Sequence, residues 1–391
     1  MTTHRVPLTP NNHYDVIVLG VGSMGAAACW FLARRGHRVL GLEQFDIPHE
    51  KGSHWGQSRI IRKAYFEHSD YVPLLERAYE NWRSFEAETG SKLYHRTGIA
   101  YFGKHDHENI AGIRHSAGLH NIPVENWDHT RCQQKYPAFQ IPPGFDVIFE
   151  PDAGFVTPER TIEMYVREAV KNGAVIKSNT PVGEWKQEGN KVRVFSQGTA
   201  YTADKLIITA GAWTSGMIPQ LKTKLQVTLQ FLAWVMPPDP DTFSLGNFPC
   251  WFVEDPELGT FYGFPLLPPE NFNGPVGLKL ARHHPGQHFR PEEIRENIPA
   301  GEEEMIRQFL KKYLPSAGDK IVSVKSCLYT YSPDTHFIID HLPGSENRVT
   351  FACGFSGHGF KFVPAVGEIL ADLATQGKTD LPIGFLRLNR F

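Results

Sequence analysis

The sequence has no surplus of either charge. Its 391 residues include 40 basic and 42 acidic side chains, which gives a formal net charge of −2. Proteins that bind nucleic acid or an anionic membrane usually concentrate Lys and Arg, so this balance argues against both partners. We therefore expect a small-molecule ligand, with no nucleic-acid partner and no membrane partner.

Cysteine is scarce and irregularly placed. The five cysteines are Cys29, Cys132, Cys250, Cys327 and Cys353. Their number is odd and no two of them have CxxC spacing, so neither a disulfide framework nor a zinc site is indicated, and we expect no metal. This usage predicts a cytoplasmic location, and the final residues LRLNRF carry no peroxisomal tripeptide.

Long apolar runs are absent except for one uncharged stretch of 18 residues, Val16 to Ala33. Glycines and a serine lie at its centre, Asp15 precedes it, and no basic leader stands before it. These features argue against a membrane span and a signal peptide. A buried strand followed by a helix explains the run better.

The segment from Tyr14 to Glu43 has the order strand, glycine turn, helix and strand that a dinucleotide requires. Gly20 permits a sharp exit from the strand, Gly22 lets backbone approach a pyrophosphate, and Gly25 lets the helix lie close to the sheet. Glu43 ends the second strand, where a carboxylate accepts hydrogen bonds from an adenosine ribose. The flanking elements argue against the alternative, an ordinary glycine turn. The expected cofactor contacts here are Gly20, Gly22, Ser23, Met24, Gly25 and Glu43.

The remaining chain predicts a second domain inserted between pieces of the first. A buried strand with a small-residue turn is expected in 202–217, and a glycine loop before an amphipathic helix in 351–362. The aromatic-rich stretch 226–279 is typical of an antiparallel sheet. We predict a mixed α/β, two-domain protein. The dinucleotide-binding domain comprises 12–85, 146–220 and 325–391, and the substrate domain comprises 86–145 and 221–324.

The segment GSHWGQSRIIRKAY, residues 52–65, places Arg59, Arg62 and Lys63 among small polar residues. Arg side chains grip phosphates or carboxylates bidentately, so one arginine for the cofactor and one for a substrate carboxylate is chemically reasonable. A solvated basic turn is the alternative.

Several motifs, in this order and spacing, carry a resemblance: GSHWGQSRIIRKAY, TADKLIITAGAW, YGFP, GLKL, SCLYTYSPDTHFIID and GFSGHGFKF. Together they resemble the monomeric sarcosine oxidase family, which includes N-methyltryptophan oxidase and pipecolate oxidase. The resemblance implies a monomeric FAD enzyme that oxidises secondary-amine amino acids. Hydride transfer to flavin N5 is followed by imine hydrolysis, and O₂ is reduced to H₂O₂. It also implies that the flavin 8α-methyl group is bonded to the sulfur of Cys327.

The resemblance assigns roles to individual residues. Lys279 matches the lysine that activates O₂, Arg62 and Lys361 match a clamp for the substrate carboxylate, and Arg59 keeps a cation at the flavin face. Tyr262, Tyr329 and His283 match residues near the substrate amine. The further expected cofactor contacts are Ser53, Ser58, Arg59, Val182, Ala210, Gly211, Trp213, Cys327, Gly357, His358, Gly359 and Lys361.

Departures from the family pattern concern the substrate pocket. Trp55, Gln57 and Ser58 replace a histidine, an aspartate and a threonine, while Phe252 replaces a methionine and Leu229 an arginine. Of these we expect Trp55 and Phe252 to contact the substrate, which favours a cyclic or larger amino acid such as L-pipecolate over sarcosine. The alternatives are a flavin dehydrogenase that passes electrons to a carrier and a catalytically idle flavin-binding protein.

Overall fold

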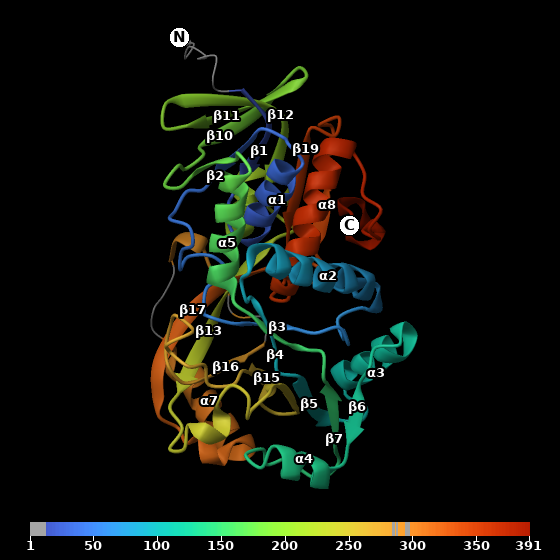
Figure 1. Ribbon diagram of the computed structural model, residues 1–391, viewed down its shortest axis with the longest axis vertical. Helices are drawn as coiled ribbons and strands as arrows, with labels where there is room; N and C mark the ends of the chain where they lie inside the picture. The colour runs from blue at the N-terminus through green and yellow to red at the C-terminus, as the bar shows by residue number, and fades with distance from the viewer. Residues whose placement is uncertain (1–12, 284–285, 287, 294–297) are drawn as a thin grey trace.

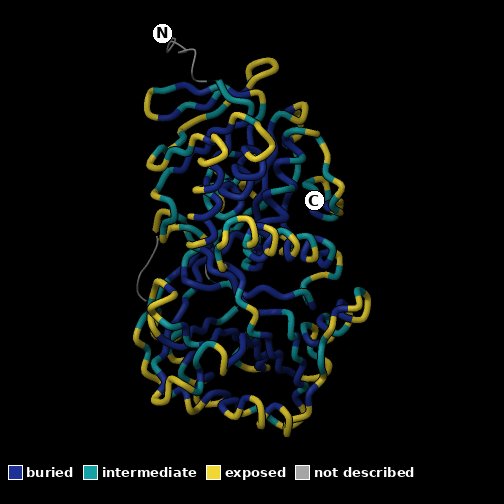
Figure 2. Tube along the Cα trace, viewed as in Figure 1, coloured by how far each residue is buried: buried dark blue, intermediate teal, exposed yellow. Residues whose placement is uncertain are grey.

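The computed structural model describes residues 13–283, 286, 288–293 and 298–391. Two large sheets lie one above the other in Figure 1, and the chain passes between them several times. Buried backbone follows both sheets, and the exposed residues lie on outer turns and on the outer faces of helices (Figure 2). The predicted mixed α/β class is confirmed.

Parallel strands from distant parts of the chain form the centre of the first sheet. They are β1 (His13–Leu19), β2 (Val39–Leu42), β9 (Val175–Lys177), β12 (Thr199–Ile208) and β19 (Val349–Cys353). Three strands extend it antiparallel: β10 (Glu184–Glu188) and β11 (Lys191–Ser196) beside β12, and β18 (Ile338–His341) beside β19. Helices α1 (Ser23–Arg34), α5 (Pro158–Lys171) and α8 (Val363–Gln376) lie on one face (Figure 1).

Small residues allow this helix layer to pack closely. A Cβ on Gly25 of α1 would lie 1.9 Å from the carbonyl oxygen of Gly20, and a Cβ on Gly367 of α8 would lie 2.5 Å from Cβ of Ala27. The first contact fixes α1 against the strand exit, as the sequence predicts for Gly25. The second allows α8 to lie directly against α1.

The second sheet is antiparallel except where β14 meets β5. Its strands in spatial order are β17 (Ile321–Tyr331), β13 (Gln226–Val235), β16 (Leu278–Arg282), β15 (Gly259–Gly263), β14 (Cys250–Asp255), β5 (Ile99–Lys104), β7 (Phe145–Glu150) and β6 (Glu125–Trp127). The aromatic stretch 226–279 supplies β13, β14, β15 and the start of β16, and thus forms much of this sheet. Strands β7 and β17 also pair in this sheet, although the predicted dinucleotide-binding domain begins its second and third pieces within them, at 146 and 325. These domain boundaries stay a prediction.

Helices cover the second sheet and the junction between the sheets. Phe309 of α7 (Ala300–Tyr313) stacks on Trp251 and Phe261, with ring centroids 5.4 and 4.2 Å apart. The other helices are α2 (Val72–Thr89), α3 (Glu108–His120), α4 (His129–Lys135) and α6 (Thr214–Met217). A small sheet of β3 (Arg59–Ile61), β8 (Gly154–Val156) and β4 (Tyr94–Arg96) also lies at the junction. Among the described helices, none has both the length and the apolar character that crossing a bilayer requires.

Candidate active site

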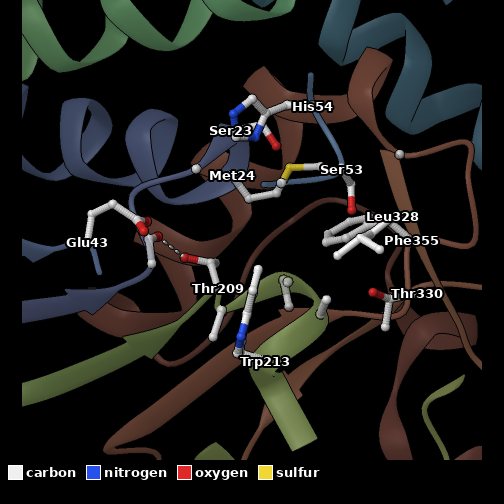
Figure 3. A pocket seen from close by; sticks show the side chains of 18 of the residues that line it. Ser23, Met24, Glu43, Ser53, His54, Thr209, Trp213, Leu328, Thr330 and Phe355 are labelled. Carbon is white, nitrogen blue, oxygen red and sulfur yellow. Dashed lines mark hydrogen bonds between the residues drawn. The ribbon is translucent and has the colours of Figure 1, made fainter. Parts of the chain in front are cut away.

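A large cavity opens where β1 and β12 end and α1 begins. Its empty volume is about 1360 Å³ with the open space at its mouth included. Figure 3 shows Ser23 and Glu43 toward one end of it, and Thr330 and Phe355 toward the other. The predicted cofactor residues that line it are Gly20, Gly22, Ser23, Met24, Glu43, Ser53, Arg59, Val182, Ala210, Gly211, Trp213, Gly357 and Gly359.

The end of this cavity at α1 fits a dinucleotide. Gly20 has φ +86°, and a Cβ there would lie 2.6 Å from the carbonyl oxygen of Thr209, so only glycine fits. Gly22 caps α1 without a side-chain hydrogen bond, which leaves the first N–H groups of the helix for an anion such as a pyrophosphate. The carboxylate of Glu43 accepts from the backbone N–H of Val21 at 2.9 Å, which fixes it at the cavity wall.

A smaller cavity of about 450 Å³ adjoins the first and shares Arg59, Tyr329, Gly357 and Phe360 with it. Every further residue predicted near the substrate lines it except Trp55. The lining residues outside the shared set are Ile60, Arg62, Glu67, Phe252, Tyr262, His283, His358 and Lys361. A small ligand in this cavity therefore lies next to whatever occupies the larger one.

Arg62 is buried in the wall of the smaller cavity and already has an anionic partner. Its Nη2 donates to both carboxylate oxygens of Glu67, at 2.7 and 2.6 Å. Burial alone raises the pKa of the Glu67 carboxyl, but Arg62 together with His358 and Lys361 lowers that pKa to about 2. The guanidinium also lies 4.0 Å from the ring centroid of Phe66. Any carboxylate that approached Arg62 would therefore have to compete with Glu67.

Lys361 belongs to a buried hydrogen-bond chain. Its Nζ donates to the carbonyl oxygen of His358 at 2.8 Å and to the Tyr65 hydroxyl at 3.4 Å. Nε2 of His358 lies 3.0 Å from the carbonyl oxygen of Thr335, which can only accept, so Nδ1 accepts from the Tyr65 hydroxyl at 2.6 Å. Burial, together with the nearby Arg62 cation, lowers the pKa of Lys361 to about 7.

Aromatic side chains form another part of the wall of the smaller cavity. Tyr262 and Tyr329 both line this cavity, and burial raises the pKa of both phenols, each of which affects the ionisation of the other. The His283 ring lies 6.3 Å from the Tyr262 ring and 5.9 Å from the Tyr329 ring. The Phe252 ring lies 5.6 Å from Tyr262 and meets Phe66 edge-on at 5.7 Å. The wall is thus bulky and mostly apolar, with polar groups gathered at one point.

Some predicted site residues line neither cavity. Lys279 is buried, and its Nζ donates to the carbonyl oxygens of Gly56 at 2.5 Å and of Ser58 at 2.7 Å. Cys327 is buried directly before residues of β17 that line the larger cavity. The residues predicted as ligand contacts that line neither cavity are Gly25, Trp55, Ser58, Lys279 and Cys327.

A family model described as FAD dependent oxidoreductase matches residues 15–373. The chain belongs to this family. This FAD-dependent oxidoreductase is 37% identical over 385 residues to a monomeric sarcosine oxidase of Bacillus sp. (strain NS-129), and the match covers 97% of each chain. It is 33% identical over 380 residues to an N-methyl-L-tryptophan oxidase of Yersinia pestis (strain Pestoides F), which covers 97% of this chain and 99% of the other.

Solved structures support the fold. NikD, described as an unusual amino acid oxidase essential for nikkomycin biosynthesis, matches with a TM-score of 0.83 and 24% identity over 96% of this chain and 98% of the other. An L-proline dehydrogenase from P. horikoshii matches with a TM-score of 0.81 and 21% identity over 97% and 98% of the two chains. The resemblance stated from the motifs is confirmed, and so is the class of enzyme, an FAD-dependent amine oxidase.

Sequence reasoning missed residues whose importance depends on their partners. Glu67 follows Arg62 by five positions, just beyond the segment 52–65, and an acid beside a basic cluster is the one local signal that could have identified it. Tyr65 and Thr209 lie in quoted motifs, but no local pattern indicates the hydrogen bond of Tyr65 to His358 or the hydrogen bond that the Thr209 hydroxyl donates to the carbonyl oxygen of Gly20. His54, which lines the larger cavity, has a buried Nε2 atom without a hydrogen-bond partner, so it can serve a bound cofactor.

Proposed function

We propose that this amine oxidase oxidises a small secondary-amine amino acid at the junction of the two cavities, with O₂ as the electron acceptor and H₂O₂ as a product. The observation that carries the proposal is the smaller cavity, in which two buried cationic side chains adjoin the dinucleotide cavity. FAD, when bound in the larger cavity, would supply the two-electron acceptor. We further propose that the enzyme acts as a cytoplasmic monomer.

The chain offers specific groups for several parts of FAD. The N-terminus of α1 at Gly22 and Ser23 would hold the pyrophosphate, and Glu43 would accept from the adenosine ribose. We propose that Cys327 provides the covalent attachment. Its place directly before cavity-lining residues of β17 supports this assignment.

The substrate carboxylate would bind between Arg62 and Lys361. The hydrogen bonds of Lys361 to His358 and Tyr65 use two of its three donors, which leaves one to point at a ligand. Arg62 contributes once the ligand carboxylate takes over part of its pairing with Glu67. This clamp orients the substrate so that its amine lies toward the polar groups of Tyr262, Tyr329 and His283.

The substrate amine must bind in its neutral form, so its surroundings in the smaller cavity must disfavour a further positive charge. His283, Tyr262 and Tyr329 line the same cavity, and each carries a group that can accept or donate a proton near the substrate amine. We propose that Lys279 supplies the preorganised positive charge that favours reduction of O₂. The carbonyl oxygens of Gly56 and Ser58 and the Ser58 hydroxyl accept from its Nζ and hold it in a fixed position, which supports this assignment.

The aromatic wall supports a substrate larger than sarcosine. Phe252 lines the smaller cavity and packs edge-on against Phe66 beside Arg62, and such an aromatic surface suits the methylene groups of a cyclic amino acid. L-Pipecolate has the secondary amine, the ring and the carboxylate that these residues can recognise. We therefore propose it as a better substrate than sarcosine.

A peroxide-coupled assay tests the proposal. The panel comprises sarcosine, N-methyl amino acids, L-proline and L-pipecolate, each compared with its methyl ester and with the matching amine that lacks the carboxylate. We expect kcat/KM to be highest for L-pipecolate and to fall by about 2–5 kcal/mol without the charged carboxylate. Sarcosine as the best substrate would contradict the size argument. Substrate oxidation that needs an artificial electron carrier and yields no peroxide would contradict the role of O₂.

A further inference from the structure

Charged side chains hold the loop between β2 and β3 from two sides. Lys279 of β16 donates from Nζ to the carbonyl oxygens of Gly56 and Ser58, at 2.5 and 2.7 Å, and to Oγ of Ser58 at 3.2 Å. Glu159, in the first turn of α5, accepts with Oε1 from the backbone N–H groups of Gly56 at 2.8 Å and of Gln57 at 3.0 Å. Gly56 thus has its N–H bound by the carboxylate and its C=O bound by the ammonium.

The same arrangement decides whether Lys279 keeps its charge. Burial and the neighbouring Arg59 guanidinium lower the pKa of Lys279 well below its usual range. Glu159 opposes this effect, as do the thiols of Cys327 and Cys250 in their ionised form. Burial raises the pKa of both thiols, which keeps them neutral at ordinary pH. Glu159 is therefore the effective negative group facing Lys279 among these neighbours.

Neither Glu159 nor Lys279 lines either cavity, so Glu159 reaches the reaction only through other residues. Its helix packs on the first sheet, whereas Lys279 stands in the second. We infer that Glu159 is a positioning residue for Lys279: it fixes the loop whose carbonyl groups bind Nζ of Lys279, and its negative charge favours the protonated form of that amine. The inference rests on the proposed function, in which the charge of Lys279 favours the reduction of O₂.

Two substitutions separate the two effects. Glu159→Gln retains an oxygen acceptor for the amides of Gly56 and Gln57 but removes the charge, whereas Glu159→Ala removes both. Glu163→Gln is the matched control, since Glu163 is exposed one turn further along α5. All variants are compared as holoenzymes of equal flavin content.

The first readout is the titration of Lys279 itself. The lysine side chains are labelled with ¹³C at Cε, and the Lys279 signal is assigned by its absence in Lys279→Met. We expect the Glu159→Gln variant to need about a tenfold higher proton concentration for half protonation of Lys279, and the Glu163→Gln control to titrate like the wild type. A Lys279 titration curve in Glu159→Gln that superimposes on the wild-type curve would overturn the inference.

The second readout is hydrogen exchange of the Gly56 and Gln57 amides. We expect exchange to be about tenfold faster in Glu159→Ala and close to wild type in Glu159→Gln, because the glutamine oxygen still accepts. Unchanged exchange in Glu159→Ala would remove the role of Glu159 in fixing the loop.

Stopped-flow reoxidation then connects the inference to catalysis. As pH rises, we expect the reoxidation rate of Glu159→Gln to fall at a lower pH than the rate of the wild type. The rate of reduction by substrate should stay within about twofold of the wild type. A shifted Lys279 titration with normal reoxidation in Lys279→Met would refute the proposed role of Lys279 and leave the inference on Glu159 standing. Slow reoxidation in Lys279→Met with an unshifted Lys279 titration in Glu159→Gln would refute the inference on Glu159 and leave the proposed role of Lys279 standing.

Discussion

The substitution Glu67→Gln tests how the smaller cavity selects a carboxylate. The carboxylate of Glu67 accepts two hydrogen bonds from the guanidinium of Arg62, and both side chains are largely buried. Glutamine has nearly the same shape but no charge. The substitution therefore leaves Arg62 in place and removes the internal competitor for a ligand carboxylate.

The size of the effect follows from the strength of the pair. The pKa of Glu67 lies at about 2, compared with 4.5 in the absence of neighbours. At about 1.4 kcal/mol for each unit, the environment favours the ionised form by about 3 kcal/mol. A ligand carboxylate recovers only part of this interaction because it must also be desolvated. We expect acetate, a carboxylate that cannot be oxidised, to bind about 10–100-fold more tightly to Glu67→Gln.

The assay is a titration of acetate followed by the flavin absorbance spectrum, with Glu80→Gln as the control because Glu80 forms an exposed pair with Arg77. Acetate affinity within about twofold of wild type in Glu67→Gln would refute the competition between Glu67 and the ligand. The unpaired Arg62 should also lower thermal stability without acetate. Because the pKa of Glu67 is depressed in the folded protein, its stabilising effect is present above about pH 4.5 and is lost as pH falls toward 2.

Three further predictions concern the other proposed roles. Cys327→Ser should release all flavin into the supernatant after acid precipitation, and full release from the wild type as well would contradict the covalent link. Lys279→Met should slow reoxidation of the reduced flavin by orders of magnitude in stopped-flow experiments, while a rate within about tenfold of wild type would place the oxygen site elsewhere. Since the pKa of Lys361 is about 7, acetate binding should weaken as pH rises through 7, and Lys361→Met should flatten that profile; an unchanged profile would exclude Lys361 from the clamp.

The parts of the site that depend on local order were predictable from the sequence. Gly20 and Gly25 are needed by the turn between one strand and the next helix, and Glu43 contacts the turn residue Val21 only 22 positions away. Periodicity and glycine spacing report such short-range requirements directly. The mixed α/β class followed from the same patterns together with the motif resemblance.

The rest depends on contacts between distant segments, which no local pattern encodes. Tyr65 meets Lys361 across 296 positions, and Lys279 meets Gly56 across 223. Trp55 was expected to contact the substrate because it replaces a family histidine, but it lines neither cavity, and its indole lies beside Lys325 of β17, with the ammonium 5.9 Å from the ring. A substituted motif position shows that the surroundings have changed, without showing toward which cavity the side chain points.

The wall shared by the two cavities has a consequence for redesigning the enzyme. Gly357 has φ +84°, and a Cβ there would lie 2.2 Å from the ring of Tyr329, so any larger residue at 357 moves a side chain that faces both cavities. A library randomised at Gly357 and Tyr329 would therefore mix variants that have lost flavin with variants of altered selectivity. Phe252 touches only the smaller cavity. Mutagenesis that begins at Phe252 can widen the range of amines accepted while leaving the cofactor loading of the population uniform.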